Sequence, residues 1–303
     1  MRAIAGAEFR FRAGAGLCLA VYFSGAMVAL APAGGLYAAD GLCPGEGGTS
    51  GRVVSVDARL ELTLASGTRL KIAGVDPPRP TPDDPDLDVR TRDRLAQWLV
   101  GQEILFRRLE PSPDRWGRVI AFAFAVAPES TGRPGPARLP VGEALIDAGF
   151  ARYEPSAAAR PCRSALLAAE AGARASGLGL WADPYYAIIA AADRPSFAEK
   201  AGSSVIVEGR ITRVASRRPR ITLYFGPRQG WDFSVTILPR SSKTFAADYA
   251  SLASLTGQTV RVRGLLDIRF GPQIEISDPD EVEPAGQGQD AAASSAAPRP
   301  TPR

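Results

Sequence analysis

The chain has 303 residues, 45% of them hydrophobic and 22% charged, a composition that is normal for a globular protein and leaves room for two domains of ordinary size. Its formal net charge of +4 is too small to predict, by itself, a strong attraction to polyanions. The sequence contains no histidine, which excludes histidine triads, histidine metal ligands and histidine general bases. Any catalysis must depend on carboxylates, Arg, Lys, Tyr, Ser or Cys.

The first 39 residues are typical of a secretory signal peptide. Three arginines precede an apolar stretch over residues 13–33, and the small residues Ala38 and Ala39 suit cleavage. We therefore expect residues 1–39 to be removed from an exported protein, located in the bacterial periplasm or secreted, with no stable membrane insertion afterwards. An uncleaved membrane anchor is the alternative, although Gly and Pro interrupt the apolar stretch.

Cleavage at this site would leave two cysteines, Cys43 and Cys162. An even pair in an exported chain predicts one disulfide, which would tie the start of the mature chain to the start of a helix. The alternative is two free thiols.

The region 40–183 alternates short strand patterns with helical ones. The expected strands are 51–57, 60–65, 69–75, 103–109 and 118–126. The expected helices are 87–100, 141–148 and 162–175. A tight turn at 114–117 joins the last two strands, and a Gly/Pro-rich insertion follows at 127–140. This order predicts a five-stranded barrel with helices packed on it.

A linker at 184–200 leads to a second region at 201–283. Its five strand-like segments are 204–215, 220–226, 232–238, 259–269 and 272–283. A short helix is expected at 245–258, between the third and fourth segments, and this order predicts a second barrel of the oligonucleotide-binding (OB) type. The tail at 284–303 is rich in Ala, Ser, Pro and Gln and is expected to be disordered. The whole chain is therefore expected to be mainly β with α (α+β).

Four motifs within residues 51–182 together resemble the thermonuclease (staphylococcal-nuclease-like) family. In chain order they are RLKIAGVDPPRP, DRWGR, VGEALIDAGFARY and LLAAEAGARASGLGLW. The resemblance implies an OB-type barrel with helices, which agrees with the expected elements. It also implies calcium-dependent hydrolysis of phosphodiester bonds in DNA and RNA.

The resemblance implies a catalytic site with two arginines, a calcium-binding aspartate and a glutamate general base. Arg118 matches the second arginine, and Asp76 matches the calcium aspartate. Lys71 occupies the place of the first arginine, and Arg79 occupies the place of the glutamate. Trp116 takes the aromatic position beside Arg118. We therefore expect Arg118 and Lys71 to be the remaining catalytic cations, with Arg79 and Trp116 as ligand contacts.

The chain departs from the family at its metal ligands and its base. The D-G-D-T motif of the family is absent, and its second aspartate falls on Arg59 or Leu60, with Asp57 and Glu61 as the nearest carboxylates. Calcium prefers about six to eight oxygen ligands, and arginine cannot accept a proton. We expect calcium binding to be weak or lost and catalysis to be degraded, while the cations still suit an anionic ligand.

Two further sets of residues in the second region are candidates for ligand contacts. The basic candidates near its first turn are Arg217, Arg218 and Arg220. The aromatic candidates on or beside its second and third strands are Tyr224, Phe225, Trp231 and Phe233. OB barrels often stack bases on such rings. The alternative is that these rings fill the barrel and the arginines are solvated.

The site residues of the first region also have structural alternatives. Arg118 could pair with Asp114 or Asp76, and Asp76 could serve only to cap a turn. Lys71 and Arg79 could be solvated surface charges. The tryptophans of this region are expected in the core rather than as stacking platforms; they are Trp98, Trp116 and Trp181.

Three functions follow from these alternatives. The first is a catalytically degraded family member that binds nucleic acid or another anionic ligand. The second is an active calcium-dependent nuclease whose site is rebuilt from Asp57, Glu61 or Asp76. The third is a structural or interaction module of the cell envelope. Arginine at position 79 favours the first and third, and the retained Arg118 favours the first two.

Overall fold

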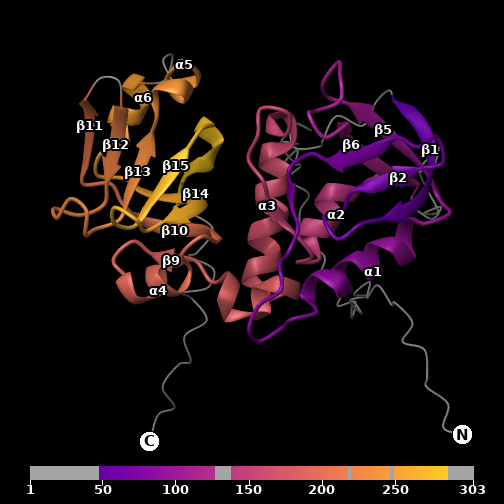
Figure 1. The fold of residues 1–303 in the computed structure, drawn as a ribbon, viewed down its shortest axis with the longest axis horizontal. Coiled ribbons are helices and arrows are strands. Elements are labelled where there is room, and N and C mark those ends of the chain that lie inside the picture. Colours follow the sequence, from indigo (N-terminus) through magenta and orange to yellow (C-terminus); the bar gives the residue numbers. More distant parts are fainter. Residues whose placement is uncertain (1–47, 127–137, 218–219, 246–248, 286–303) are drawn as a thin grey trace, which may run out of the picture. The chain divides into compact units, whose positions relative to one another are not determined.

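The computed structural model of the chain describes residues 48–126, 138–217, 220–245 and 249–285 (Figure 1). The expected signal peptide, Cys43, Arg218, most of the insertion at 127–140 and all but two residues of the tail lie outside these ranges. Cys162 is buried, and its disulfide with Cys43 stays a prediction. Within the described ranges, no helix combines the length and the apolar character needed to cross a bilayer.

The first part of the described chain forms a closed five-stranded β-barrel (Figure 1). Its strands are β1 (Thr49–Val56), β2 (Leu62–Leu64), β3 (Arg69–Ile72), β5 (Glu103–Arg108) and β6 (Arg118–Val126). Antiparallel pairing runs in the order β3-β2-β1-β5-β6, and parallel pairing of β3 with β6 closes the barrel. The short strand β7 (Arg138–Pro140) extends the sheet beyond β6. The protein is mixed α+β, as expected, and this barrel is consistent with the OB type.

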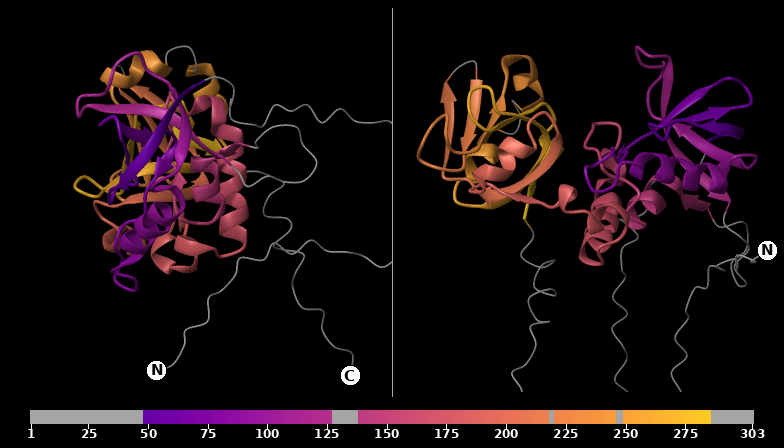
Figure 2. Two further views of the ribbon diagram at one scale, coloured as in Figure 1. Left: turned by 90° about the vertical axis from the view of Figure 1, so that its right-hand side faces the viewer. Right: turned by 60° about the horizontal axis from the view of Figure 1, so that its bottom comes forward.

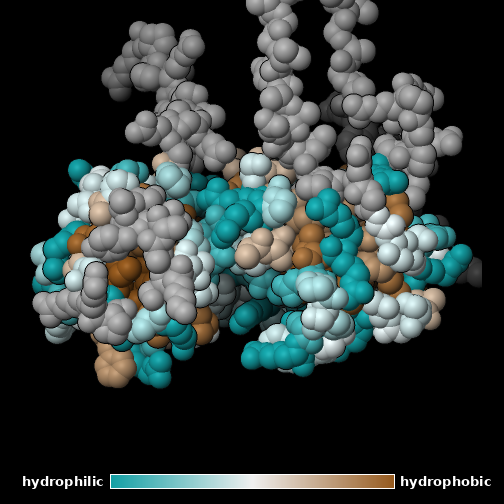
Figure 3. All heavy atoms as spheres, turned by 90° about the horizontal axis from the view of Figure 1, so that it is seen from above, coloured by the Kyte–Doolittle hydropathy of each residue, from teal (hydrophilic) through white to brown (hydrophobic). Residues whose placement is uncertain are grey.

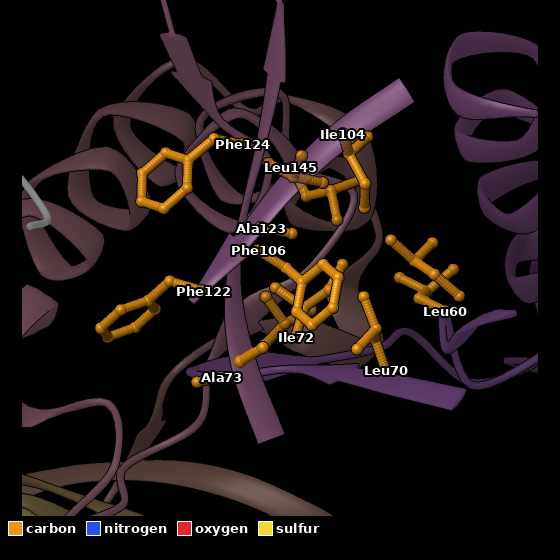
Figure 4. Close-up of a cluster of buried hydrophobic side chains, with 14 of the residues drawn as sticks. Leu60, Leu70, Ile72, Ala73, Ile104, Phe106, Phe122, Ala123, Phe124 and Leu145 are labelled. Atoms are coloured by element: carbon orange, nitrogen blue, oxygen red, sulfur yellow. The ribbon is translucent and has the colours of Figure 1, made fainter. Parts of the chain in front are cut away.

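The barrel core follows from the alternation of side chains along each strand. Leu60, Leu70 and Phe106 converge inside the barrel, and each is almost completely buried (Figure 4). On β6, the side chains of Ala123 and Phe122 point to opposite sides of the strand (Figure 4). Burying a large apolar side chain contributes about 1.5–3 kcal/mol, so this strand stabilises the fold on both of its faces.

Three helices pack on this barrel at the positions that the sequence predicts, within one residue at each end. They are α1 (Leu87–Leu99), α2 (Val141–Asp147) and α3 (Arg163–Ala175). Helix α1 contacts β1, whereas α2 contacts both β6 and α3 (Figures 1 and 2). The buried positions of α3 recur with helical spacing and include a glutamate, Glu170, among apolar residues.

The second part of the described chain forms a mainly antiparallel sheet with its own hydrophobic core. Its strands are β9 (Ile189–Ala190), β10 (Ser204–Arg210), β11 (Arg213–Arg217), β12 (Arg220–Tyr224), β13 (Ser234–Ile237), β14 (Thr259–Asp267), β15 (Gln273–Ile276) and β16 (Val282–Pro284). Pairing runs in the order β11-β12-β13-β15-β14-β10-β9, and β16 adds to β14. Helices α5 (Ser242–Phe245) and α6 (Tyr249–Ser254) lie between β13 and β14 in the chain, where a helix was expected.

Several short elements were not predicted, because segments of two or three residues carry no periodic pattern. Strands β4 (Val75–Asp76) and β8 (Arg152–Tyr153) form an antiparallel pair. The range 184–200, expected as a linker, contains η3 (Pro184–Tyr186), β9 and α4 (Arg194–Glu199), and β9 pairs with β10. The remaining 3-10 turns are η1 (Arg160–Cys162), η2 (Gly179–Ala182), η4 (Pro239–Ser241) and η6 (Pro279–Glu281).

A buried ionic cluster joins α3 to β14 and β16. The two terminal nitrogens of Arg263 donate to the two carboxylate oxygens of Glu170 at 2.9 and 2.6 Å, and Arg263 Nη2 also reaches Glu283 at 2.8 Å. Burial by itself raises the pKa of Glu170, but the charge and hydrogen bonds of Arg263 outweigh this effect and lower it. The cluster therefore stays charged although its three side chains are almost completely buried.

Candidate functional site

A cleft of about 510 Å³ opens beside β3 and β6 of the first barrel. The cations that line it are Arg59, Lys71, Arg79 and Arg118. The carboxylates that line it are Glu61, Asp76, Asp88 and Glu154. The structure thus brings together the four charged residues that the sequence assigned to one site in this region, at positions 71, 76, 79 and 118.

The parallel pairing of β3 with β6 explains why basic side chains gather on this wall. In this register Arg69 lies opposite Arg118, and Lys71 lies opposite Ile120. Alternate residues of paired strands point to the same face, so Arg69, Lys71 and Arg118 share one face of the barrel wall. The sequence motifs supplied these residues, and the closure of the barrel brings them together.

Arg118 is buried and paired on both sides of its guanidinium group. Its exposed fraction is only 8%. Its Nε donates to Asp114 Oδ2 at 2.8 Å, and its Nη1 donates to Glu61 Oε1 at 2.5 Å. The alternative of a structural pairing with Asp114 is therefore correct, and the second partner is Glu61 rather than Asp76.

The turn before β6 holds Asp114 in its charged form. Asp114 Oδ1 accepts hydrogen bonds from the backbone nitrogens of Trp116 and Arg118. Burial alone would raise the pKa of Asp114, but these bonds and the Arg118 side chain outweigh it and lower the pKa to about 2. Burial by itself would lower the pKa of Arg118. The carboxylates of Asp114 and Glu61 more than offset this effect, so the pKa of Arg118 is raised. Both partners remain ionised at neutral pH.

A second turn, between β1 and β2, decides which residue replaces the missing aspartate of the D-G-D-T motif. Asp57 Oδ1 accepts from the backbone nitrogens of Arg59 and Glu61, both at 2.9 Å. Leu60 has a left-handed backbone, with φ of 59°, and buries its side chain in the barrel core (Figure 4). Arg59 lines the cleft and is exposed. Both positions border the cleft, but only the side chain at position 59 is exposed there.

Asp76 and Glu154, the other two acidic residues near the centre of the cleft, are also paired with cations. Asp76 Oδ2 accepts from Arg152 Nη2 at 2.7 Å, and the β4–β8 pairing places these two residues opposite each other. Arg152 is buried and also donates to the carbonyl oxygen of Ser204 at 3.2 Å. Lys71 Nζ lies 2.8 Å from Glu154 Oε2, in a pair that is partly exposed to water.

Arg79 is held in place through its backbone. Its nitrogen donates to the hydroxyl of Tyr186 at 2.7 Å, and that hydroxyl donates to the carbonyl oxygen of Arg79 at 3.0 Å. Pro78 and Pro80 flank it and further restrict the chain. Within the described residues, the guanidinium groups of Arg59 and Arg79 make no hydrogen bond or ion pair. These two cations are positioned on the cleft with their donors available.

The acidic side chains are poorly arranged to hold a metal ion. In the described parts of the chain, no group of three or more His, Cys, Asp or Glu side chains could ligate one. Glu61 accepts hydrogen bonds from Arg69 and Arg118, and Asp76 accepts one from Arg152. A cation entering the cleft would have to displace these arginines.

Trp116 behaves differently from the core tryptophan expected at this position. It is 53% exposed, and the guanidinium carbons of Arg115 and Arg118 lie 3.9 and 4.6 Å from the centroid of its ring. The other two tryptophans of this region, Trp98 and Trp181, are partly buried against apolar clusters. Trp116 therefore covers the paired Arg118 from outside.

The candidates of the second region divide into two groups. Phe233 is buried and Phe225 packs 5.0 Å from it, so these rings fill the core, whereas Trp231 is 69% exposed. Tyr224 is covered by Arg213 at 4.2 Å. Arg220 is exposed at the start of β12 and does not line the cleft of the first barrel, and Arg217 is the last residue of β11.

The sequence analysis missed Arg152, Glu154 and Tyr186 as parts of the site. Arg152 and Glu154 lie within and next to a recognised motif, but only the β4–β8 pairing brings them to the cleft. Tyr186 lies 107 residues from Arg79 and had no sequence signal. No protein-family model matches this chain, and no curated protein matches it either.

Proposed function

We propose that this cleft binds an anionic polymer, single-stranded nucleic acid in the first instance, without calcium and with little or no phosphodiester hydrolysis. One observation carries the proposal: the central carboxylates of the cleft are each bonded to a cation, while the guanidinium groups of Arg59 and Arg79 have no partner within the described residues. Guanidinium groups bind phosphates through two parallel hydrogen bonds. The chain would then be an exported, catalytically degraded relative of the thermonuclease family.

The loss of a general base supports weak catalysis. Arg79 stands where the family resemblance places the glutamate, and arginine has no proton acceptor. Losing a general base lowers a rate by about 10²–10⁴-fold. Arg118, the second catalytic cation of the resemblance, is neutralised by Asp114 and Glu61 and is therefore less able to stabilise charge on a phosphate.

Calcium does not fit the donor set. The site would need about six to eight oxygen ligands, but Glu61 and Asp76 are held by arginines and position 59 carries a positive charge. The alternative of a rebuilt nuclease is disfavoured for the same reason, since the carboxylate of Asp57 is used by its own turn.

We further infer that the second region is also an OB-type barrel. Only Ile211 and Thr212 separate β10 from β11. The two strands would be one bent strand that pairs with β14 through its first half and with β12 through its second half. The parallel pairing of β13 with β15 in this region corresponds to the parallel pairing of β3 with β6 in the first barrel.

Binding should be measured with the purified protein and a fluorescent single-stranded DNA at several salt concentrations. The double variant Arg59→Ala/Arg79→Ala should weaken binding and reduce the salt slope by about 1.4, since each phosphate contact on a single strand contributes about 0.7. The matched control is Arg94→Ala/Arg210→Ala, which removes two exposed arginines outside the cleft. Equal losses in the two variants, or tighter binding with calcium, would contradict the proposal.

A gain-of-function series tests why calcium is excluded. Arg59→Asp/Arg79→Glu adds two carboxylates to the cleft but leaves Asp76 bonded to Arg152, so we expect little calcium binding. Adding Arg152→Gln should release Asp76 and give a calcium-dependent rise in melting temperature. Calcium stabilisation of the unmodified protein would show that the arginines do not block the site.

A further inference from the structure

Two loops of the second region carry the most exposed large apolar side chains in the described residues. Phe270 is 81% exposed and Trp231 is 69% exposed, and Ile268, two residues before Phe270 in the chain, is 41% exposed. Hydrophilic side chains cover much of the face seen in Figure 3, with apolar ones in small groups. We call Trp231, Ile268 and Phe270, with Arg228 and Arg269 next to them, the aromatic tip. Apolar surface of this kind marks interaction sites.

The backbone locks the two loops together behind these side chains. A Cβ atom at Gly271 would lie only 2.3 Å from the carbonyl oxygen of Gly230, so the two chains meet where no side chain fits. Both glycines have positive φ, 79° and 99°, which other residues rarely adopt. Ser234 N also donates to the carbonyl oxygen of Pro272 at 3.0 Å. The exposed rings are therefore presented by a fixed support.

Cations accompany the exposed rings. The side chains of Arg228 and Arg269 are 66% and 79% exposed. A third arginine, Arg194, places its guanidinium carbon 5.9 Å from the centroid of the Trp231 ring. The two nearby carboxylates are the ion-pair partners of these arginines: Asp232 pairs with Arg194 and Arg228, and Asp267 pairs with Arg269. Three arginines and two carboxylates leave a net charge of +1 (+3 − 2), and the two most exposed arginines, Arg228 and Arg269, could exchange their aspartates for an anionic partner.

We propose that the aromatic tip docks reversibly on the surface of an anionic lipid bilayer. A side chain that projects with four-fifths of its surface exposed suits insertion at the headgroup level, whereas base stacking needs a ring that lies flat with one face supported. Ile268 has no ring to stack on a base, yet it adds apolar area for a bilayer. Tryptophan is enriched at membrane interfaces, and arginines near a surface bind anionic headgroups. Such contact is peripheral and requires no membrane span.

The test is sedimentation of the protein with vesicles of phosphatidylcholine, with and without about one-third phosphatidylglycerol. We expect binding only to the anionic vesicles. Trp231→Ala/Phe270→Ala should weaken it at least about tenfold. Arg228→Gln/Arg269→Gln should weaken it at least about fivefold and reduce its salt dependence. The control Val54→Ala/Leu139→Ala removes exposed apolar side chains elsewhere and should bind as the unmodified protein does.

Trp231→Phe/Phe270→Trp keeps an aromatic ring at both positions and should bind anionic vesicles as the unmodified protein does. Its binding shows whether the alanine pair fails because it lacks the rings or because the loops no longer fold. The proposal is overturned if the unmodified protein ignores anionic vesicles or if the alanine pair binds them normally. It is also overturned if the alanine pair loses single-stranded DNA binding or self-association instead. Arg59→Ala/Arg79→Ala should leave vesicle binding unchanged, so this result is independent of the function proposed for the cleft.

Discussion

Two buried arginines, Arg118 in the first barrel and Arg263 in β14, are paired in similar ways but in different surroundings. Each is held by two carboxylates and is less than 10% exposed. Both arginines border a cleft, but Glu61 beside Arg118 also accepts a hydrogen bond from Arg69, whereas both carboxylate oxygens of Glu170, which is 1% exposed on α3, are held by Arg263. A buried arginine on a strand is therefore not, by itself, evidence of a free anion site. Whether its guanidinium group can bind an anion depends on the carboxylates that it already pairs with.

Removing Arg263 should have the largest effect, because it leaves the carboxylate of Glu170 buried without its cation. We expect Arg263→Ala to lower the free energy of unfolding by about 3–5 kcal/mol. Urea unfolding measures this loss. The paired variant Arg263→Met/Glu170→Gln should lose much less, and a loss below about 1 kcal/mol in the single variant would contradict the buried cluster.

Removing Arg118 should cost less, about 1–3 kcal/mol, and this difference tests the comparison directly. Asp114 keeps its hydrogen bonds from two backbone nitrogens, and Glu61 keeps its hydrogen bond from Arg69 at 2.7 Å. The same urea measurements apply. If Arg118→Ala were as damaging as Arg263→Ala, the remaining partners of Asp114 and Glu61 would not compensate for the lost arginine, and the two clusters would be equivalent.

Acid should weaken the Arg263 cluster through Glu170. Its pKa is lowered in the folded protein, so its stabilising contribution is complete above the ordinary value of 4.5 and is lost as pH falls below it. The slope of stability against pH is at most about 1.4 kcal/mol per unit for one proton. Glu170→Gln should flatten this slope below about pH 4.5, whereas the exposed control Glu110→Gln should not. An unchanged slope in Glu170→Gln would show that other carboxylates cause the acid sensitivity.

The smallest expected effect is an increase in affinity for single-stranded DNA. Glu61→Gln removes a negative charge from the cleft and weakens the hold on Arg118, which should tighten single-stranded DNA binding by about fivefold, or about 1 kcal/mol. Fluorescence anisotropy at constant salt checks this. Unchanged or weaker binding by a folded Glu61→Gln protein would mean that Arg118 remains structural even when it is released.

The regular elements of the first barrel could be predicted from sequence, because their patterns are long enough to be periodic. Strand β6 and helix α3 were placed within one residue by their apolar spacing. The Asp114 turn was also recognised, since Asp and Gly have strong turn preferences. The two-residue strands β4 and β8 carry no such pattern, and they were missed together with the Arg152–Asp76 bond that depends on them.

The sequence alone determined which residue types are available at the site: no histidine, an arginine at 79, a lysine at 71 and no aspartate at 59 or 60. These facts already argued against a general base and a complete calcium site. Only the tertiary structure decided which cations of the site pair with which carboxylates. Pairing between residues far apart in the chain, such as Arg118 with Glu61 and Arg79 with Tyr186, depends on barrel closure and on distances of a few ångströms. Local sequence preferences do not encode such distances. Only the folded chain shows that the guanidinium groups of Arg59 and Arg79 are unpaired within the described residues and that Arg118 is ion-paired.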